Sequence, residues 1–257
     1  MNFKRSVFYM SVMAFAAATQ THAVIQIDES AKAVLPKLKV IYMTVMDSDN
    51  SGSSQACVKA AQDFLNEQCV SGKEKWSSTE PSKIETIALW KKRHKQMGSP
   101  SKATCSIESL IRRVKGGKFP RSISPFVDFY NGISLKYELP FGGEDLSKIV
   151  PLGSYILVVK AAKGDEAYLE LGKSSSDAVE FPKIDELIYA DAEGTVCRAL
   201  NWRESARTML DKNSRNAIFV TEVMEKKEEL RGMDAMLELG QLITRHCGGN
   251  FNIGVAE

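Results

Sequence analysis

The feature that most constrains the fold is a change in the spacing of apolar side chains about halfway along the chain. Before residue 140 they recur at helical intervals, as in Ile107, Ile111 and Val114, which predicts helices that each turn one face toward a core. After residue 150 they come in short runs rich in β-branched and aromatic residues, which are typical of strands. Helices early and last, with most strands late, predict an α+β fold in which a mixed sheet packs against helices.

Turn and capping residues divide the chain into expected elements. Helices are expected over residues 54–70, from Thr79 as N-cap to Gly98, from Ser106 to Gly116, and over 126–137 and 228–247, the last closing the fold. Strands are expected over 38–45, 155–160, 168–171, 187–190, 196–200 and 217–223. Residues 191–194 are expected to form a hairpin turn, and Glu144 and Asp145 are expected to begin a short helix.

Residues 1–23 have the three-part layout of a secretory signal peptide. Lys4 and Arg5 give a positive start, residues 6–18 form an uncharged apolar run, and Thr21 and Ala23 are the small residues that a signal peptidase reads. The run of about 13 residues is shorter than the roughly 20 that span a bilayer, so no membrane span is expected in the mature chain. The sequence therefore predicts a signal peptide over 1–23, a folded domain over 24–257, and export to the periplasm or the medium. The alternatives are an incorrect upstream start or a buried first helix, with a cytoplasmic location.

Cysteine and histidine residues give no sign of a metal site. The five cysteines are odd in number, there is no Cys-x-x-Cys, and the three histidines have no zinc-ligand spacing. We therefore expect no metal. Most of the thiols are expected to be buried as small apolar side chains, and their redox state stays open.

Charge is unevenly distributed although the formal net charge is only +2. Residues 73–121 hold thirteen Lys or Arg and four Asp or Glu, a local net charge of +9. Such a segment is typical of a surface that faces a polyanion such as RNA. The alternative is a pair of solvated helices. The candidate RNA-binding residues are Lys91, Lys92, Arg93, Arg112 and Arg113.

Two motifs give the sequence a family resemblance. They are VD-x-YN-x-x-S at residues 127–134 and CR-x-x-NWR at residues 197–203, inside the longer stretches 125–146 and 185–203. With residues 106–120 and the basic run after Trp90, they resemble the landmarks of stand-alone B3/B4 tRNA-binding domain proteins. These are related to the editing module of the phenylalanyl-tRNA synthetase beta subunit. The resemblance covers most of residues 90–203; residues 24–80 and 210–257 fit by expected structure more than by motif.

The resemblance implies a sheet-and-helix B3/B4 core and a relation to a pocket that hydrolyses tyrosine wrongly esterified to phenylalanine tRNA. It implies tRNA or aminoacyl-tRNA as partner. It does not imply a complete synthetase, because the chain is too short for an added aminoacylation domain and has no Gly-rich phosphate loop. We expect no cofactor.

The matched motifs supply the candidate site residues, because an aminoacyl ester needs only a positioned water, a side-chain pocket and stabilisation of the oxyanion. The catalytic candidates are Asn131, Ser134, Glu186 and Arg198, and the substrate-binding candidates are Asp128, Asp191, Trp202 and Arg203. We expect Asn131 and Arg198 on opposing walls of one cleft and Trp202 near its mouth. The histidines are poorly placed for a nucleophilic triad.

Each candidate also has a structural alternative. Asp128 can cap or pair with an arginine, Asn131 and Ser134 can hold the proline turns, and Trp202 can belong to the core. Arg198 can be a buried partner of Glu186 or Asp191. Three functions remain open from sequence: a hydrolase of misacylated tRNA acting in trans, a non-catalytic RNA-binding module, and an exported protein that binds an amino-acid or peptide derivative.

Overall fold

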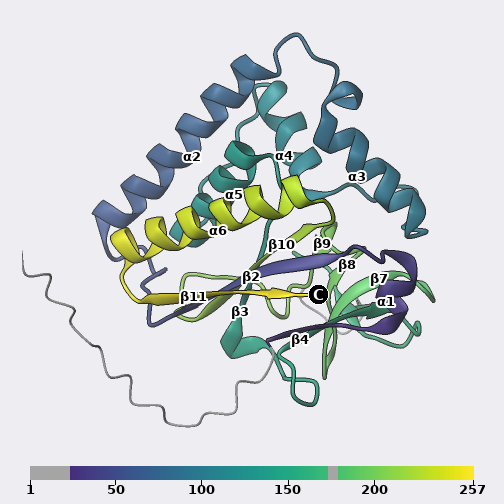
Figure 1. Ribbon diagram of the computed structural model, residues 1–257. Helices are drawn as coiled ribbons and strands as arrows, with labels where there is room; N and C mark the ends of the chain where they lie inside the picture. The colour runs from purple at the N-terminus through teal and green to yellow at the C-terminus, as the bar shows by residue number, and fades with distance from the viewer. Residues whose placement is uncertain (1–23, 173–178) are drawn as a thin grey trace, which may run out of the picture.

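The computed structural model describes residues 24–172 and 179–257, in which a layer of helices covers one sheet and a second sheet packs on the other side (Figure 1). The predicted signal peptide lies outside the described residues. The α-helices are α1 (Glu29–Val34), α2 (Gln55–Lys75), α3 (Glu85–Gln96), α4 (Ser106–Lys115), α5 (Pro125–Tyr137) and α6 (Lys226–Cys247). Two 3-10 turns are η1 (Pro81–Lys83) and η2 (Leu146–Lys148).

Three sheets are present in the described part of the chain, with strand orders β11-β2-β10-β3, β1-β4-β7-β8-β9 and β5-β6. The strands of the first are β2 (Lys39–Met46), β3 (Gly142–Asp145), β10 (Ala217–Val223) and β11 (Asn250–Ala256). Those of the second are β1 (Ile25–Ile27), β4 (Leu157–Ala161), β7 (Leu187–Asp191), β8 (Gly194–Arg198) and β9 (Arg203–Glu204). The small third sheet pairs β5 (Tyr168–Leu169) with β6 (Val179–Glu180).

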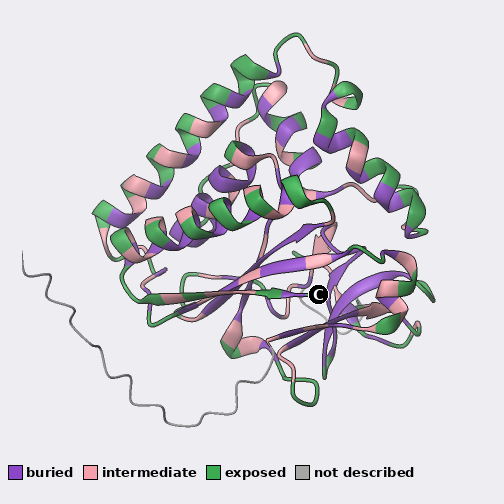
Figure 2. Cartoon of the chain, viewed as in Figure 1, coloured by how far each residue is buried: buried purple, intermediate pink, exposed green. Residues whose placement is uncertain are grey.

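Strand β2 shows how the sequence alternation builds two cores. Ile41, Met43 and Val45 belong to the core shared with α2, α5 and α6. Val40, on the opposite face of the strand, belongs to the core between the two large sheets, because successive strand side chains point to opposite faces. Figure 2 shows the exposed residues along the outer faces of α2 and α6, as expected for helices that bury one stripe.

Helix α5 lies close against α2 because Gly132 leaves room for an aromatic ring. A Cβ added at Gly132 would lie 2.6 Å from the ring of Phe64 on α2. The contact fixes the rotation of α5 and therefore the direction of its neighbours Tyr130 and Asn131.

The predicted α+β class is confirmed, with a mixed sheet, packed helices and a C-terminal helix. The hairpin is also confirmed, since Asp191 pairs with Gly194 between β7 and β8. Strands β1 and β11 and helix α1 were not predicted from the sequence. The edge strand β11 follows the closing helix and pairs with β2 over seven residue pairs from Asn250 to Ala256.

Two expected helix starts were wrong. Thr79 caps no helix, because η1 comes first and α3 begins at Glu85 with Ile84 at the N-cap position. Glu144 lies in β3, where it is paired with Ile218 of β10. Asp145 alone caps the short turn η2 by accepting hydrogen bonds from Ser147. Sheet pairing, which local sequence does not reveal, overrides the acidic start.

Cys57 at the start of α2 and Cys247 at the end of α6 form a disulfide across 190 residues. Cys69, Cys105 and Cys197 are free and buried, as expected for small apolar side chains. Over the described ranges, no helix is both long enough and apolar enough to cross a membrane.

Candidate active site

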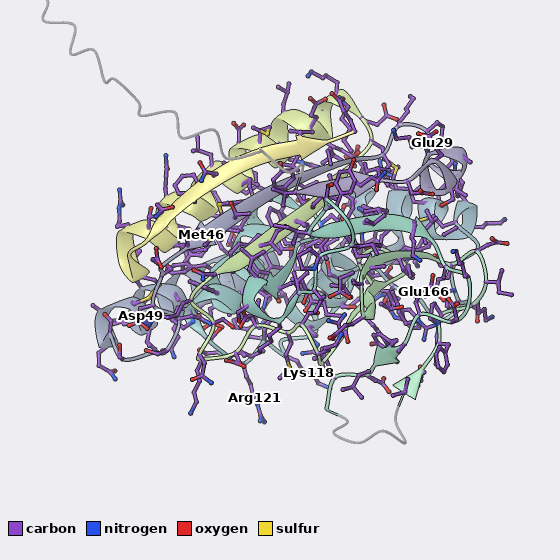
Figure 3. The ribbon with its side chains drawn as sticks, turned by 90° about the horizontal axis from the view of Figure 1, so that it is seen from below. Glu29, Met46, Asp49, Lys118, Arg121 and Glu166 are labelled. Atoms are coloured by element: carbon purple, nitrogen blue, oxygen red, sulfur yellow. A yellow bond between two sulfur atoms is a disulfide. The ribbon has the colours of Figure 1, made fainter. Side chains whose placement is uncertain are left out.

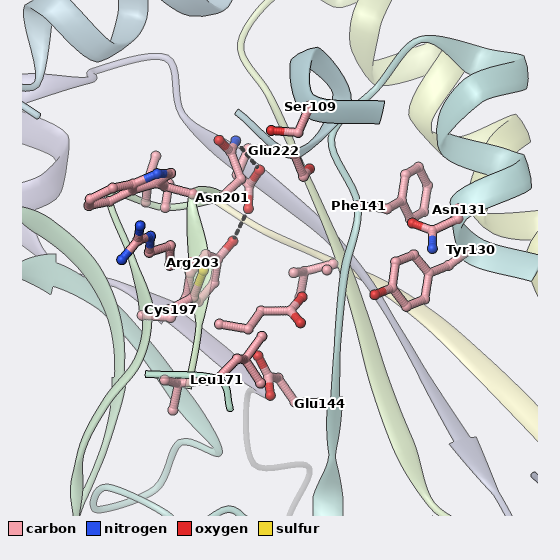
Figure 4. A pocket seen from close by; sticks show the side chains of 18 of the residues that line it. Ser109, Tyr130, Asn131, Phe141, Glu144, Leu171, Cys197, Asn201, Arg203 and Glu222 are labelled. Carbon is pink, nitrogen blue, oxygen red and sulfur yellow. Dashed lines mark hydrogen bonds between the residues drawn. The ribbon is translucent and has the colours of Figure 1, made fainter. Parts of the chain in front are cut away.

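A pocket of about 440 Å³ lies between the two large sheets and is flanked by α4 and α5 (Figure 4). Its wall combines residues from both resemblance motifs: Tyr130 and Asn131 come from α5, and Asn201, Trp202 and Arg203 come from the turn between β8 and β9. The two motifs therefore meet in space although about 70 residues separate them in sequence.

The α5 wall presents two hydrogen-bonding side chains. Tyr130 points toward the centre of the pocket, and burial raises the pKa of its phenol well above the usual value, so it is a neutral donor. The amide of Asn131 makes no side-chain hydrogen bond within the described residues and is half-buried. Both groups are available to a ligand.

The opposing wall depends on an unusual turn. Ala199 and Leu200 have φ values of 46° and 62°, in the left-handed region that non-glycine residues rarely adopt. The turn is closed by the Trp202 N–H, which donates to the Arg198 carbonyl at 3.1 Å. Such backbone conformations persist only where contacts with the surrounding structure impose them, and they are often found at functional sites. Here they bring Asn201 and Trp202 into the pocket wall.

The Trp202 ring is surrounded by cations. The guanidinium carbons of Arg203 and Arg198 lie 4.6 and 5.3 Å from the ring centre, and the Lys102 ammonium lies 5.9 Å away. Cations over an indole face stabilise its orientation. Trp202 is half-buried, so part of the residue reaches solvent.

The pocket wall contains a buried polar network centred on Glu222, in which Oδ1 of Asn201 has no hydrogen-bond partner among the described residues. The Tyr189 hydroxyl donates to Oε1 of Glu222 at 2.7 Å, and the Asn201 amide donates to Oε2 at 2.8 Å. Burial raises the pKa of Glu222, while these two donors lower it.

Glu144 and Glu204 also line the pocket, and neither was predicted from the sequence as a site residue. Burial raises the pKa of Glu204 to about 7, and raises that of Glu144 well above its usual value, with the neighbouring Glu204 charge adding to the effect. A weak signal was present, because Glu204 directly follows the CR-x-x-NWR motif and Glu144 follows two glycines. Burial of two acids in one pocket is not visible from sequence.

Arg198 does not line the pocket, which corrects its expected place on the opposing wall. Its Nε and one terminal nitrogen donate to the two carboxylate oxygens of Glu186, each at 2.9 Å, and the other terminal nitrogen donates to Glu180 at 3.2 Å. Arg198 and Glu186 are 7% and 2% exposed. Because a buried charge must be paired, Arg198 takes its alternative role as a buried ion-pair partner of Glu186. Its guanidinium also lies over the ring of Trp202.

Three other candidates are engaged in local structure. The Ser134 hydroxyl donates to the Leu139 carbonyl at 2.6 Å, closing the end of α5. Asp128 accepts from the Ser122 hydroxyl and the Ile123 N–H. Asp191 accepts from the hairpin N–H groups and from Arg207. None of the three lines the pocket, because each side chain is bound by its own local partners.

The basic candidates divide into three groups. Arg93 is buried, makes bonds of 2.9 and 2.7 Å to Glu228, and stacks on Trp90, so its expected contact with RNA is corrected to a role in the core. Arg112 pairs with Glu108 on its own helix. Lys91, Lys92 and Arg113 are exposed, and Arg113 also lines the pocket. Figure 3 shows Lys118 and Arg121, which follow α4 in the chain, at one edge of the molecule.

The pocket offers no activated thiol. Cys197 lines it, but burial and the nearby glutamates raise the pKa of its thiol well above the usual value. Among residues 24–172 and 179–257, no three His, Cys, Asp or Glu side chains are grouped as a metal site requires. The pocket side chains can donate and accept hydrogen bonds, and the buried carboxyl groups can transfer protons.

The fold and pocket together define an α+β domain with a pocket between two sheets, lined by apolar side chains and a smaller set of polar ones. The B3/4 domain family matches residues 93–241, more than half of the chain, and the chain belongs to that family. This confirms the resemblance expected from the motifs.

Comparisons with curated proteins and with solved structures do not extend this family assignment. No curated protein matches the chain. Among solved structures, it is similar to an N-terminal fragment of the phenylalanyl-tRNA synthetase beta subunit from Pyrococcus horikoshii, with 13% identity and a TM-score of 0.40. The match covers 89% of this chain and 50% of that one, so this chain spans about half of the fragment.

Proposed function

We propose that this protein hydrolyses the ester bond of a misacylated aminoacyl-tRNA in trans, with the aminoacyl group held in the pocket. The observation that carries the proposal is the convergence of the two family motifs on one cavity, with Asn131 on one wall and Trp202 and Arg203 on the other. Family membership and the synthetase fragment's printed name suggest the tRNA partner.

The pocket walls match the parts of such a substrate. Ester hydrolysis requires a water near the carbonyl carbon and donors for the oxyanion, and the Tyr130 hydroxyl and Asn131 amide are donors on the same wall. Arg113 can face a phosphate or the terminal ribose, as can Arg203 if it exchanges its partner Glu170 for the ligand. A base that displaces one of the cations over Trp202 can stack on its ring. The pocket volume of about 440 Å³ lies in the range of small-molecule sites.

Replacing Asn131 with alanine is expected to reduce deacylation of tyrosyl-tRNA by about 100-fold, as for loss of one oxyanion donor. The thermal midpoint should stay within a few degrees, because the amide makes no hydrogen bond with the described residues. Release of labelled tyrosine from mischarged tRNA measures the first quantity, and calorimetry measures the second. The control is Asn66→Ala on the exposed face of α2. Full activity in the Asn131 variant would remove this residue from the site.

RNA binding is expected to fall steeply as salt rises, because phosphate contacts release counterions. The double variant Lys91→Glu/Lys92→Glu should weaken binding to all tRNAs by at least about 10-fold and flatten the salt dependence. Arg93 is left intact because it is buried with Glu228. The control reverses Lys212 and Arg215, which are exposed outside the basic segment. Filter binding at several salt concentrations measures the affinity for tRNA. An affinity that does not change with salt concentration would argue against an RNA-binding surface.

A second candidate is an exported protein whose pocket binds an amino-acid or peptide derivative. It is favoured by the predicted signal peptide and by the Cys57–Cys247 disulfide, because disulfides persist mainly in oxidising compartments. Export would separate the protein from the cell's own tRNA. It would leave the pocket chemistry unchanged but alter its substrate.

Export is expected to yield a mature chain that begins at Val24 and lies outside the cytoplasm. Cell fractionation followed by N-terminal sequencing measures both. Thiol labelling under non-reducing conditions should then modify neither Cys57 nor Cys247. Full-length protein with Met1 intact in the cytosol would reject export and leave the tRNA hydrolase as the stronger candidate.

A further inference from the structure

Two pocket carboxyl groups come from strands of different sheets. Glu144 lies in β3 of the four-stranded sheet, and Glu204 lies in β9 of the five-stranded sheet. Both line the pocket, and Glu144 appears beside the cavity in Figure 4. Glu144 is only 4% exposed and has no cationic partner among the described residues within ion-pair distance.

Two glycines bring the carboxyl groups together. The Gly143 N–H donates to Oε1 of Glu204 at 3.4 Å, and a Cβ added at Gly142 would lie 3.2 Å from the same oxygen. The backbone immediately before Glu144 is therefore in contact with the carboxyl group of Glu204. A larger residue at Gly142 would crowd this approach.

One oxygen of Glu144 is left without a protein partner. Its Oε2 is buried and makes no hydrogen bond of normal geometry within the described residues, although the Thr208 hydroxyl lies near enough to lower the pKa of Glu144. A buried polar atom without a partner is unfavourable. A water, a ligand oxygen or a proton shared with Glu204 would satisfy it.

The surroundings favour one proton held between the two groups. Two buried carboxyl groups that lie close together do not both ionise easily. Burial raises the pKa of each group, and the charge of Glu204 raises that of Glu144 further. Arg207 lowers the pKa of Glu144, whereas Asp191 raises it. Arg207 and Asp191 act on Glu144 directly, and both glutamates act on Tyr130 and Cys197. The other titratable or charged groups that line the pocket are Arg113, Tyr168, Glu170, Tyr189, Arg203 and Glu222.

We propose that Glu144 and Glu204 form a carboxyl dyad that activates the water attacking the ester carbonyl. The inference rests on the proposed hydrolysis and assigns the proton transfers within it. Neither residue was a candidate from the motifs, and both act as catalytic residues because they line the cavity in which the ester is held.

The proton transfers balance. The ionised Glu204 takes a proton from water as the water oxygen bonds to the carbonyl carbon, and the protonated Glu144 donates its proton to the carbonyl oxygen. When the tetrahedral intermediate collapses, the bond from carbon to the ribose oxygen breaks and Glu204 protonates that oxygen. Glu144 takes a proton back from the remaining hydroxyl, so the free amino acid leaves and the dyad is restored.

Carboxyl ¹³C NMR titration of the full mature chain tests the coupling directly. Glu204 should titrate near neutral pH. The Glu204→Gln variant should lower the pKa of Glu144 by about 1 or more, because a neighbouring negative charge has been removed. Glu67→Gln, at an exposed position on α2, should leave the pKa of Glu144 unchanged. A pKa of Glu144 that does not respond to Glu204→Gln would overturn the dyad.

Deacylation kinetics test the catalytic role. Glu144→Gln and Glu204→Gln should each lower kcat by about 10²–10⁴-fold with little change in KM, and Glu204→Asp should recover part of the rate. The native protein should show a bell-shaped pH profile. An active native protein whose two glutamine variants stay within threefold of it, as folded proteins, would overturn only the dyad. A native protein inactive on every aminoacyl-tRNA would overturn the proposed hydrolysis as well.

Discussion

Replacing Arg198 with alanine is expected to lower the free energy of unfolding by about 3–5 kcal/mol, the usual cost of removing one member of a buried ion pair. The substitution leaves the carboxylate of Glu186, which is 2% exposed, without its two-bond partner. It also removes the guanidinium that lies over the rings of Trp202 and Tyr168. For a chain of this size the thermal midpoint should fall by roughly 10 °C.

A matched comparison separates structure from chemistry at this site. Arg113→Ala removes an exposed arginine that, unlike Arg198, lines the pocket, and it should leave the thermal midpoint within a few degrees. The double variant Arg198→Met/Glu186→Leu should recover part of the lost stability, since both buried charges are then gone. An Arg198→Ala protein as stable as the native one would mean that this pair contributes nothing to the fold.

Removing the Cys57–Cys247 disulfide is expected to cost about 2–5 kcal/mol, because the bond closes a loop across 190 residues and restricts the unfolded chain. The bond joins the start of α2 to the end of α6, two helices that pack over the same sheet. The double variant Cys57→Ala/Cys247→Ala should therefore unfold at a lower urea concentration than the native protein.

Reduction provides the internal control for this prediction. A reducing agent should lower the urea midpoint of the native protein and should not change that of the double variant. Cys69, Cys105 and Cys197 are buried free thiols, so they should not respond under native conditions. Equal midpoints for native protein with and without reductant would show that the disulfide does not stabilise the fold.

Local sequence predicted several elements of the fold for clear physical reasons. The stripe of Ile107, Ile111 and Val114 predicts α4, and the two glycines after Lys115 end it. The β-branched run from Ala217 predicts β10 with the observed bounds. Strand β11 and the pair β1 and α1 were missed, because their stability comes from pairing and packing with distant strands rather than from a strong local pattern.

Polar residues show the limit of sequence reasoning most clearly. Asn131 and Ser134 share one helix and one motif, yet only Asn131 lines the pocket, because the Ser134 hydroxyl is bound to the Leu139 carbonyl. Arg198 and Arg203 share the second motif, yet Arg198 is bound to Glu186 inside the protein while Arg203 reaches the pocket. A motif identifies residues with a structural or functional role, but it does not predict which group each side chain will contact.

Periodicity, turn residues and short motifs are local properties, so the α+β class, the order of most helices and strands, and the B3/4 family could be predicted from the sequence. Three features became visible only in the folded chain: Glu144 and Glu204 line one cavity, Arg93 and Arg198 are in buried ion pairs, and Cys57 bonds to Cys247. The reason is physical: burial, ion pairing and disulfide formation depend on which residues are close in space, and chain packing brings those residues together across long separations.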